Sequence, residues 1–155
     1  MTEKPNYDLD NSLGMLLDWA SQFMRLELNR KFAAAGLEAT SEQWKILIIL
    51  WFEDGLTQQQ LAEKTHKSKV SLVKLVDGLE RRGLVNRRPD PNDRRSNRIF
   101  LTPKGRGIQE QLIGLAQDNL NQATAGVDPQ ELALCINVLK QVIVNMKGTD
   151  IEATD

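Results

Sequence analysis

The sequence predicts a mainly helical chain with a small β-hairpin, an α+β fold, from three observations. Over most of the 155 residues, apolar side chains recur every three or four positions, as amphipathic helices require. Between Leu84 and Leu101 that period is lost, and turn-forming residues separate two short runs of strand formers. Hydrophobic residues make up 41% and charged residues 26% of the chain, which is ordinary for a globular domain.

The first expected element is a long helix over residues 11–35, which Gly36 ends. One apolar set recurs along it at helical spacing, and a second set widens the apolar face. The two sets are Leu13, Leu16, Leu17, Ala20, Met24, Leu28 and Phe32, and Met15, Trp19, Phe23 and Leu26. Because a helix with two apolar faces has more to bury than one small core can cover, it is the first indication of a dimer.

Capping motifs predict three shorter helices. Thr40-Ser-Glu-Gln43 and Thr57-Gln-Gln-Gln60 each place a hydroxyl three residues before a glutamine, the pattern of a capping box. They begin a helix that ends near Gly55 and a short helix that contains Leu61 and Ala62. Ser68 is expected to cap the third helix, which Gly83 ends and whose basic residues lie largely off its apolar face.

After Gly83 we expect two short strands, residues 84–88 and 98–101, joined by a long polar loop over residues 89–97. Thr102-Pro103 begins a helix that ends by Gly126, and Asp128-Pro129 begins the last one. The last helix carries an apolar seam at alternating spacings of four and three, which suits association between helices and would stay exposed on a lone protomer. Its members are Leu132, Ile136, Leu139, Ile143 and Met146.

Charge is distributed very unevenly along the chain. The net charge is −1, yet residues 64–106 hold 13 Lys and Arg against 4 Asp and Glu. A basic segment inside an acidic remainder makes a focused positive field of the kind that attracts a phosphate backbone. The alternative, a solvated charged face with no partner, fits so lopsided a distribution less well.

The order helix, short helix, basic helix and hairpin is that of a winged helix-turn-helix lobe within a helical frame. A major groove about 12 Å wide admits one helix, whose N-terminal residues meet the base edges. Thr57 begins the short helix, whose free backbone N–H groups suit a phosphate. The basic helix offers lysines for guanine, a serine for base or phosphate, and valines for thymine methyl groups. The candidates here are Lys67, Ser68, Lys69, Val70, Ser71, Val73 and Lys74.

The hairpin supplies a second set of candidates. Arg94, Arg95 and Arg98 are expected on a loop too polar to bury. An arginine held at a loop tip suits a narrow minor groove, where the negative potential is deepest.

Residues 57–105 resemble the MarR family of bacterial transcription regulators. The matching stretches include Leu75-Val-Asp-Gly-Leu-Glu-Arg-Arg-Gly-Leu-Val85, the Asp93-x-Arg95 signature of the hairpin, or wing, and Leu101-Thr-Pro-Lys-Gly105. The resemblance implies that Arg95 enters the minor groove, that Asp93 holds the wing in place, and that the first and the last two helices form a dimer interface. Ser71-Leu-Val-Lys74 departs from the family, so its base preference does not transfer. His66 replaces a common glycine and Thr65 a common leucine.

The resemblance also implies how the chain is divided and what it binds. Residues 1–155 would be one MarR-like domain, with a DNA-binding lobe over 40–104 and dimerisation regions over 8–36 and 105–148. The expected function is a sequence-specific, homodimeric regulator, a repressor by the commoner habit of the family, which binds double-stranded DNA at a pseudo-palindromic operator. A small phenolic or lipophilic effector is a further expected partner, with Trp19, Phe23 and Trp44 as candidate ligand-binding residues, although aromatic residues at helical spacing are more often core.

Other functions fit the sequence less well. An enzyme with a nucleophile–base pair would need its histidine beside a serine or cysteine, and the one histidine, His66, lies in the basic lobe and suits a turn better than a pH sensor. A protein-interaction module of the same fold remains the alternative. No cofactor or metal site is expected, Cys135 is expected to pack in the core rather than to sense oxidants, and the absence of a signal peptide or apolar span predicts a cytoplasmic protein.

Overall fold

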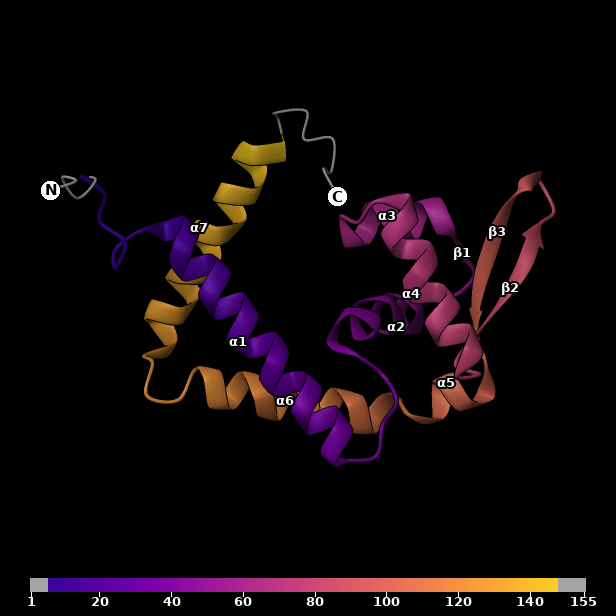
Figure 1. Cartoon of the computed structure of the whole chain (residues 1–155), viewed down its shortest axis with the longest axis horizontal. Helices are drawn as coiled ribbons and strands as arrows, with labels where there is room; N and C mark the ends of the chain where they lie inside the picture. Colours follow the sequence, from indigo (N-terminus) through magenta and orange to yellow (C-terminus); the bar gives the residue numbers. More distant parts are fainter. Residues whose placement is uncertain (1–5, 148–155) are drawn as a thin grey trace, which may run out of the picture.

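In the computed structural model, which describes residues 6–147, the chain forms a frame of long helices and a smaller lobe. The frame consists of α1 (Leu13–Ala34), α6 (Gln109–Ala123) and α7 (Pro129–Lys147). The lobe holds α2 (Ser41–Phe52), β1 (Leu56–Thr57), α3 (Gln58–Thr65), α4 (Lys69–Arg81), β2 (Val85–Asp90), β3 (Asp93–Leu101) and α5 (Pro103–Gly107). Figure 1 shows α1 crossing α6, with the wing of β2 and β3 at the far end of the lobe. The predicted fold class, mainly helical with a small β-hairpin wing, is confirmed.

The helices of the lobe begin where their capping residues predict. Thr40 and Thr57 each accept a hydrogen bond from the backbone of the glutamine three residues on, and each glutamine side chain accepts one from the backbone of the capping residue. Ser68 caps α4 by accepting from the backbone N–H of Ser71 at 3.1 Å. These local bonds satisfy N–H groups that the helices themselves leave unpaired.

The sheet differs from the predicted hairpin. It has three antiparallel strands in the order β1-β3-β2. Ile99 of the central strand β3 lies opposite Leu56 of β1 on one side and Arg87 of β2 on the other. The predicted long loop over 89–97 is wrong, because β2 and β3 continue to Asp90 and from Asp93 and leave only Pro91 and Asn92 in the turn. Around the turn Pro89 and residues 91–95 are exposed, and the one buried residue, Asp90, is polar, so this pairing leaves no apolar alternation in the sequence.

The single helix predicted from Thr102 to Gly126 is divided in two. Ile108 has φ −90° and ψ 0° and separates α5 from α6. Gly105 and Gly107 weaken the helix just before this point. Gly105 is buried, and a Cβ there would lie 2.1 Å from the carbonyl oxygen of Leu84, so the chain at the base of the wing requires glycine.

The hydrophobic core lies in the lobe and is completed from the frame. Leu28 and Phe32 of α1 and Leu112 of α6 are buried in the same cluster as the lobe residues Leu47 and Leu72. The frame helices are joined by a buried polar contact as well, since the Asn119 side-chain amide donates to the carbonyl of Met24 at 3.1 Å. The orientation of the lobe on the frame is therefore set by packing on α1 and α6.

Helix α7 contributes nothing to this core. None of its residues is buried, and Ile136, Ile143 and Val144 are exposed apolar side chains. The prediction that Cys135 packs in the core is wrong for the protomer, because Cys135 lies on this helix and is exposed. Among the described residues, no helix is long and apolar enough to cross a membrane.

Candidate nucleic-acid interface

Helix α4 presents one buried face and one charged face. Leu72, Val76 and Leu79 are buried in the core, which turns Lys69 and Lys74 outward, and both lysines are exposed. Neither forms an ion pair with any described residue. The start of the helix therefore carries two uncompensated positive charges.

The other side chains predicted on α4 are placed less uniformly. Val70 is 57% exposed and can contact an apolar group outside the protein. Val73 is half-buried. The Ser71 hydroxyl accepts a hydrogen bond from Ser68 at 3.0 Å, so both serines are engaged in starting the helix. Arg81, which was not among the predicted site residues, is exposed near Lys74.

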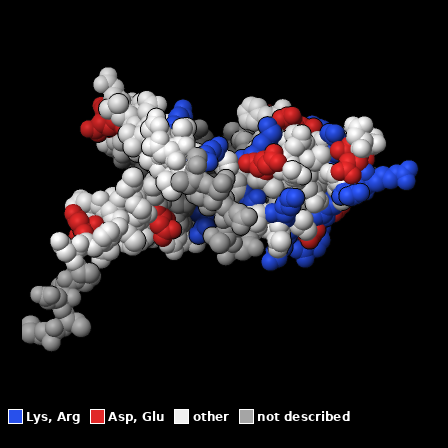
Figure 2. Space-filling view, turned by 90° about the horizontal axis from the view of Figure 1, so that it is seen from above, with Lys and Arg blue, Asp and Glu red and all other residues white. Residues whose placement is uncertain are grey.

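The wing carries a second pair of free cations. Arg94 and Arg95 are exposed in the first residues of β3 and form no ion pair with a described residue. The Asp93 carboxylate accepts a hydrogen bond from the backbone N–H of Arg95 at 2.9 Å, which fixes the backbone at the tip. Figure 2 shows Lys and Arg side chains gathered over the lobe, with a basic extension at its outer end.

Other basic residues of the same segment are paired within the protein. Arg98 lies on β3 rather than in a loop, contacts the Asp90 carboxylate at 3.2 Å and donates to the carbonyl of Gly55 at 3.0 Å. Arg87 contacts both Asp77 and Glu80 of α4 at 2.6 Å. These two arginines hold the wing to the rest of the lobe, and their charge is largely compensated.

Two carboxylates of the lobe, Asp90 beside Arg98 and Glu42 beside Lys67, are held in their charged form. The backbone N–H of Asn92 lowers the pKa of the Asp90 carboxyl, and Arg98 lowers it further against the opposing effect of burial. Burial would raise the pKa of Glu42, but hydrogen bonds and charge attraction from Lys67 and Lys45 outweigh it and lower the pKa. The stability that these carboxylates contribute is therefore present at neutral pH and is lost as the pH falls through their lowered pKa values.

The turn before α4 contains the one non-glycine residue with positive φ among residues 6–147. His66 has φ 54° and ψ 39° and ends α3 in the left-handed region. Glycine is favoured at such a position because it lacks the Cβ that crowds the backbone. The geometry thus supports the interpretation of His66 as a turn residue.

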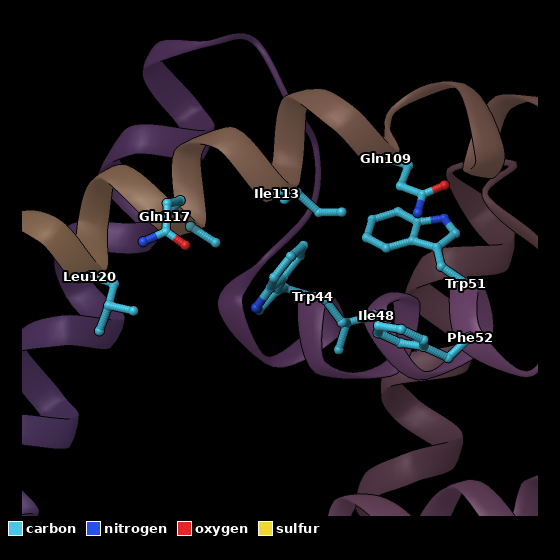
Figure 3. Close-up of a pocket in the computed structure, with 9 residues that line it drawn as sticks. Trp44, Ile48, Trp51, Phe52, Gln109, Ile113, Gln117 and Leu120 are labelled. Carbon is cyan, nitrogen blue, oxygen red and sulfur yellow. The ribbon is translucent and has the colours of Figure 1, made fainter. Parts of the chain in front are cut away.

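The candidate ligand-binding residues do not lie together. Trp44 lines a cavity of about 400 Å³ between α2 and α6, with Ile48, Trp51, Phe52, Gln109, Ile113, Ala116, Gln117 and Leu120. Figure 3 shows Trp44 and Trp51 on α2 facing the side chains of α6 across this space. Phe23 lines a separate hollow between α1 and α6, and Trp19 lines neither of the two.

Trp51 connects the cavity to the base of the wing. Its indole Nε1 donates to the carbonyl of Gly105 at 3.1 Å, and its ring packs edge-on against Trp44 with centroids 5.7 Å apart.

No group of three or more side chains suited to a metal ion occurs in the part of the chain that the structure describes.

Comparison with known proteins places these features in one family. The model of the MarR family matches residues 39–96. A regulator from Methylorubrum extorquens (strain PA1), the HTH-type transcriptional regulator TtmR, is 38% identical over 72 residues, which is 46% of this chain and only 37% of that protein.

Solved structures match over much more of the chain. The transcriptional regulator PA3341 is 34% identical, with 88% of this chain and 99% of that chain covered at a TM-score of 0.74. The PcaV transcriptional regulator from Streptomyces coelicolor, solved in complex with its natural ligand, is 25% identical, with 90% and 97% covered and a TM-score of 0.79. The match to the family model, the near-complete structural match and the winged lobe described above together show that this chain belongs to the MarR family.

Proposed function

We propose that this chain is a sequence-specific DNA-binding transcription regulator that binds a pseudo-palindromic operator as a homodimer. The observation that carries the proposal is the sorting of the basic residues. Those that brace the lobe are paired with carboxylates, whereas Lys69, Lys74, Arg94 and Arg95 are exposed and without ion-pair partners among the described residues. Uncompensated cations on a helix start and a wing tip suit phosphate and groove contacts.

In this proposal α4 lies in the major groove and the wing reaches the adjacent minor groove. Lys69 and Lys74 contact bases or phosphates, Val70 contacts thymine methyl groups, and Arg95 enters the minor groove with Asp93 bracing its backbone. Residues 40–104 form the DNA-binding lobe. The dimerisation regions span 8–36 and 105–148, of which residue 148 lies outside the described residues, as do residues 1–5 and 149–155 of the proposed single domain.

The homodimer is supported by apolar surface that the protomer leaves open. Helix α7 runs for 19 residues with none buried, and α1 exposes Leu16, Phe23 and Leu26. Monomeric proteins rarely expose large contiguous apolar patches, so these side chains suit an interface with a second copy. Related by a two-fold axis, two protomers would present their α4 helices to major grooves about 34 Å apart.

The same sorting of cations favours DNA binding over a protein-interaction module of this fold, because a module that does not bind DNA has no need for unpaired cations on both the recognition helix and the wing tip. We propose repression as the outcome, since a dimer seated across an operator blocks access to nearby promoter sequence. We propose the cytoplasm as the place where it acts.

The proposal is tested by selecting bound duplexes from a random pool and measuring affinity against salt. We expect enrichment of an inverted repeat and a logarithmic affinity that falls by about 0.9 per phosphate contact for each logarithmic unit of salt. Enrichment of no sequence, together with no salt-dependent affinity for random duplex, would support the interaction module instead. A reporter placed behind the selected site then distinguishes repression from activation.

We also propose that the cavity between α2 and α6 binds a small aromatic effector. Its volume of about 400 Å³ lies within the usual range for ligand sites. Its walls are mostly apolar, and Gln109 and Gln117 supply polar groups from α6. PcaV, a relative of the same fold, was solved with its natural ligand. Trp44 and Trp51 would contact the effector, and Trp19 and Phe23 lie elsewhere.

Filling the cavity is expected to abolish the effector response and to leave DNA binding intact. A panel of phenols and aromatic acids should quench Trp44 and Trp51 fluorescence and raise the melting temperature, with a gain of about 2.7 kcal/mol in stability at 100 times the Kd. In Ala116→Leu, whose new side chain enters the cavity, both responses should disappear. The matched control is Ala34→Leu at the exposed end of α1. Unchanged ligand responses in Ala116→Leu would place the effector elsewhere.

A further inference from the structure

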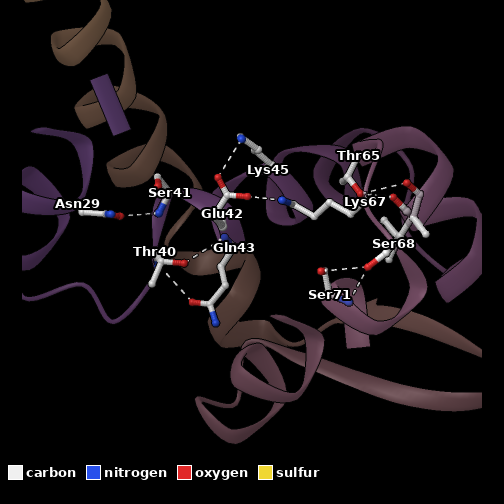
Figure 4. Close-up of polar contacts among 12 residues, drawn as sticks. Asn29, Thr40, Ser41, Glu42, Gln43, Lys45, Thr65, Lys67, Ser68 and Ser71 are labelled. Carbon is white, nitrogen blue, oxygen red and sulfur yellow. Dashed lines mark hydrogen bonds and ion pairs between the residues drawn. The ribbon is translucent and has the colours of Figure 1, made fainter. Parts of the chain in front are cut away.

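Lys67, in the turn between α3 and α4, is neutralised within the protein. Its ammonium contacts Oε2 of Glu42, the second residue of α2, and Lys45 contacts Oε1 of the same carboxylate at 3.0 Å (Figure 4). The side chains of Lys67 and Glu42 are only 20% and 25% exposed, whereas that of Lys45 is 54% exposed. A lysine so paired brings no free charge to a phosphate.

The same contact connects the frame to the start of α4. At one end, the Asn29 side chain of α1 accepts a hydrogen bond from the backbone N–H of Ser41 at 2.7 Å, next to Glu42. At the other end, Lys67 immediately precedes Ser68, which caps α4. Figure 4 shows these contacts following one another from α1 through the beginning of α2 to the turn before α4.

The far end of α4 is fixed to α2 as well. Arg82 donates to the side-chain oxygen of Gln43, and a Cβ on the buried Gly78 would lie 2.5 Å from the Gln43 amide nitrogen. Helix α4 therefore packs closely on the first turn of α2 at Gly78. The Glu42–Lys67 pair supplies the second attachment, at the end of α4 that would meet the bases.

We propose that Glu42 is a positioning residue for DNA recognition, which withholds Lys67 from the phosphates and fixes the start of α4 against α2. This inference rests on the proposed function and extends it to a residue outside the cationic surface. It has two separable consequences. Breaking the pair loosens α4 and lowers the preference for the operator over random DNA, and freeing Lys67 adds one phosphate contact.

Four variants separate the two consequences. Glu42→Gln breaks the pair and frees Lys67 together with Lys45, and Lys67→Met breaks the pair while Lys45 keeps its partner. The double variant frees Lys45 alone, so its comparison with Glu42→Gln isolates the charge of Lys67. Glu38→Gln is the matched control. Glu38 lies outside α2, and its substitution changes the net charge by the same amount as Glu42→Gln without breaking an ion pair to a described residue. Affinity for the selected operator and for a random duplex is measured against salt concentration, and circular dichroism and melting establish that each variant is folded at the temperature used.

Only Glu42→Gln should steepen the logarithmic salt dependence on random duplex, by about 0.9, the increment of one added phosphate contact. Lys67→Met and the double variant should keep the slope of the unmodified protein. All three pair-breaking variants should lose operator-over-random preference, and Glu38→Gln should retain it.

Two results would overturn the inference. If the logarithmic salt dependence of Lys67→Met is shallower by about 0.9 than that of the unmodified protein, Lys67 itself contacts a phosphate. If the preference for operator over random duplex is equal in all variants, Glu42 has no positioning role. Both differ from failure of the proposed function, in which the unmodified protein shows no salt-dependent affinity for DNA and the inference falls with it.

Discussion

Replacing Ile143 with glutamate is expected to separate the homodimer into protomers and to lower operator affinity by about 10²–10⁴-fold. Ile143 is 51% exposed on α7 and lies in the C-terminal half of the apolar seam, one heptad after Ile136. Two-fold symmetry brings the same surface of both protomers together, so the variant would place two new charges in one apolar interface. A protomer that binds one half-site loses the advantage of linked binding, which commonly reaches this magnitude.

Sedimentation and titration of the selected operator measure the two parts of this expectation. The matched control is Gln141→Glu, which adds the same charge to the same helix. Gln141 lies opposite the seam at about 100° per residue, and its side chain only donates to Asn145 at 2.8 Å. Because α7 has no residue in the core, the lobe should keep its folded spectrum in both variants. A dimeric Ile143→Glu protein with unchanged affinity would place the interface on another surface.

The elements that the sequence predicts well are those whose signals are local. Thr40, Thr57 and Ser68 satisfy backbone groups three residues away, so four residues of sequence are enough to locate the start of each helix. Strand β1 has two residues and pairs with β3 across more than forty positions, Leu56 opposite Ile99. No local period reveals such a pairing.

The candidate site is predictable in the same uneven way. Counting charges locates the basic lobe, but it cannot tell the free cations Lys69 and Arg95 from Lys67 and Arg98, whose partners depend on tertiary structure. Glu42 lies 25 positions before Lys67, and no local pattern singles it out. Cys135 shows a related limit, because an apolar helix face indicates burial without saying whether the same chain or a second one covers it.

Replacing Arg95 with alanine is expected to weaken operator binding by about 2–6 kcal/mol, which is roughly 30-fold or more. A specific arginine contact is commonly worth about 1–3 kcal/mol, and a homodimer would lose one in each half-site. The melting temperature should stay nearly unchanged, because the Arg95 side chain is exposed and without an ion-pair partner among residues 6–147.

Arg94→Ala provides the matched control for this prediction. Successive side chains on a strand point to opposite faces, so Arg94 and Arg95 cannot both enter the same minor groove. If Arg95 is the groove contact, Arg94→Ala should weaken operator and random duplex about equally and reduce the salt slope by about 0.9 for each phosphate that is no longer neutralised. Arg95→Ala should instead weaken binding to the operator more than binding to random duplex. The opposite pattern would exchange the two roles, and an unaltered operator affinity in both variants would remove the wing from the DNA interface.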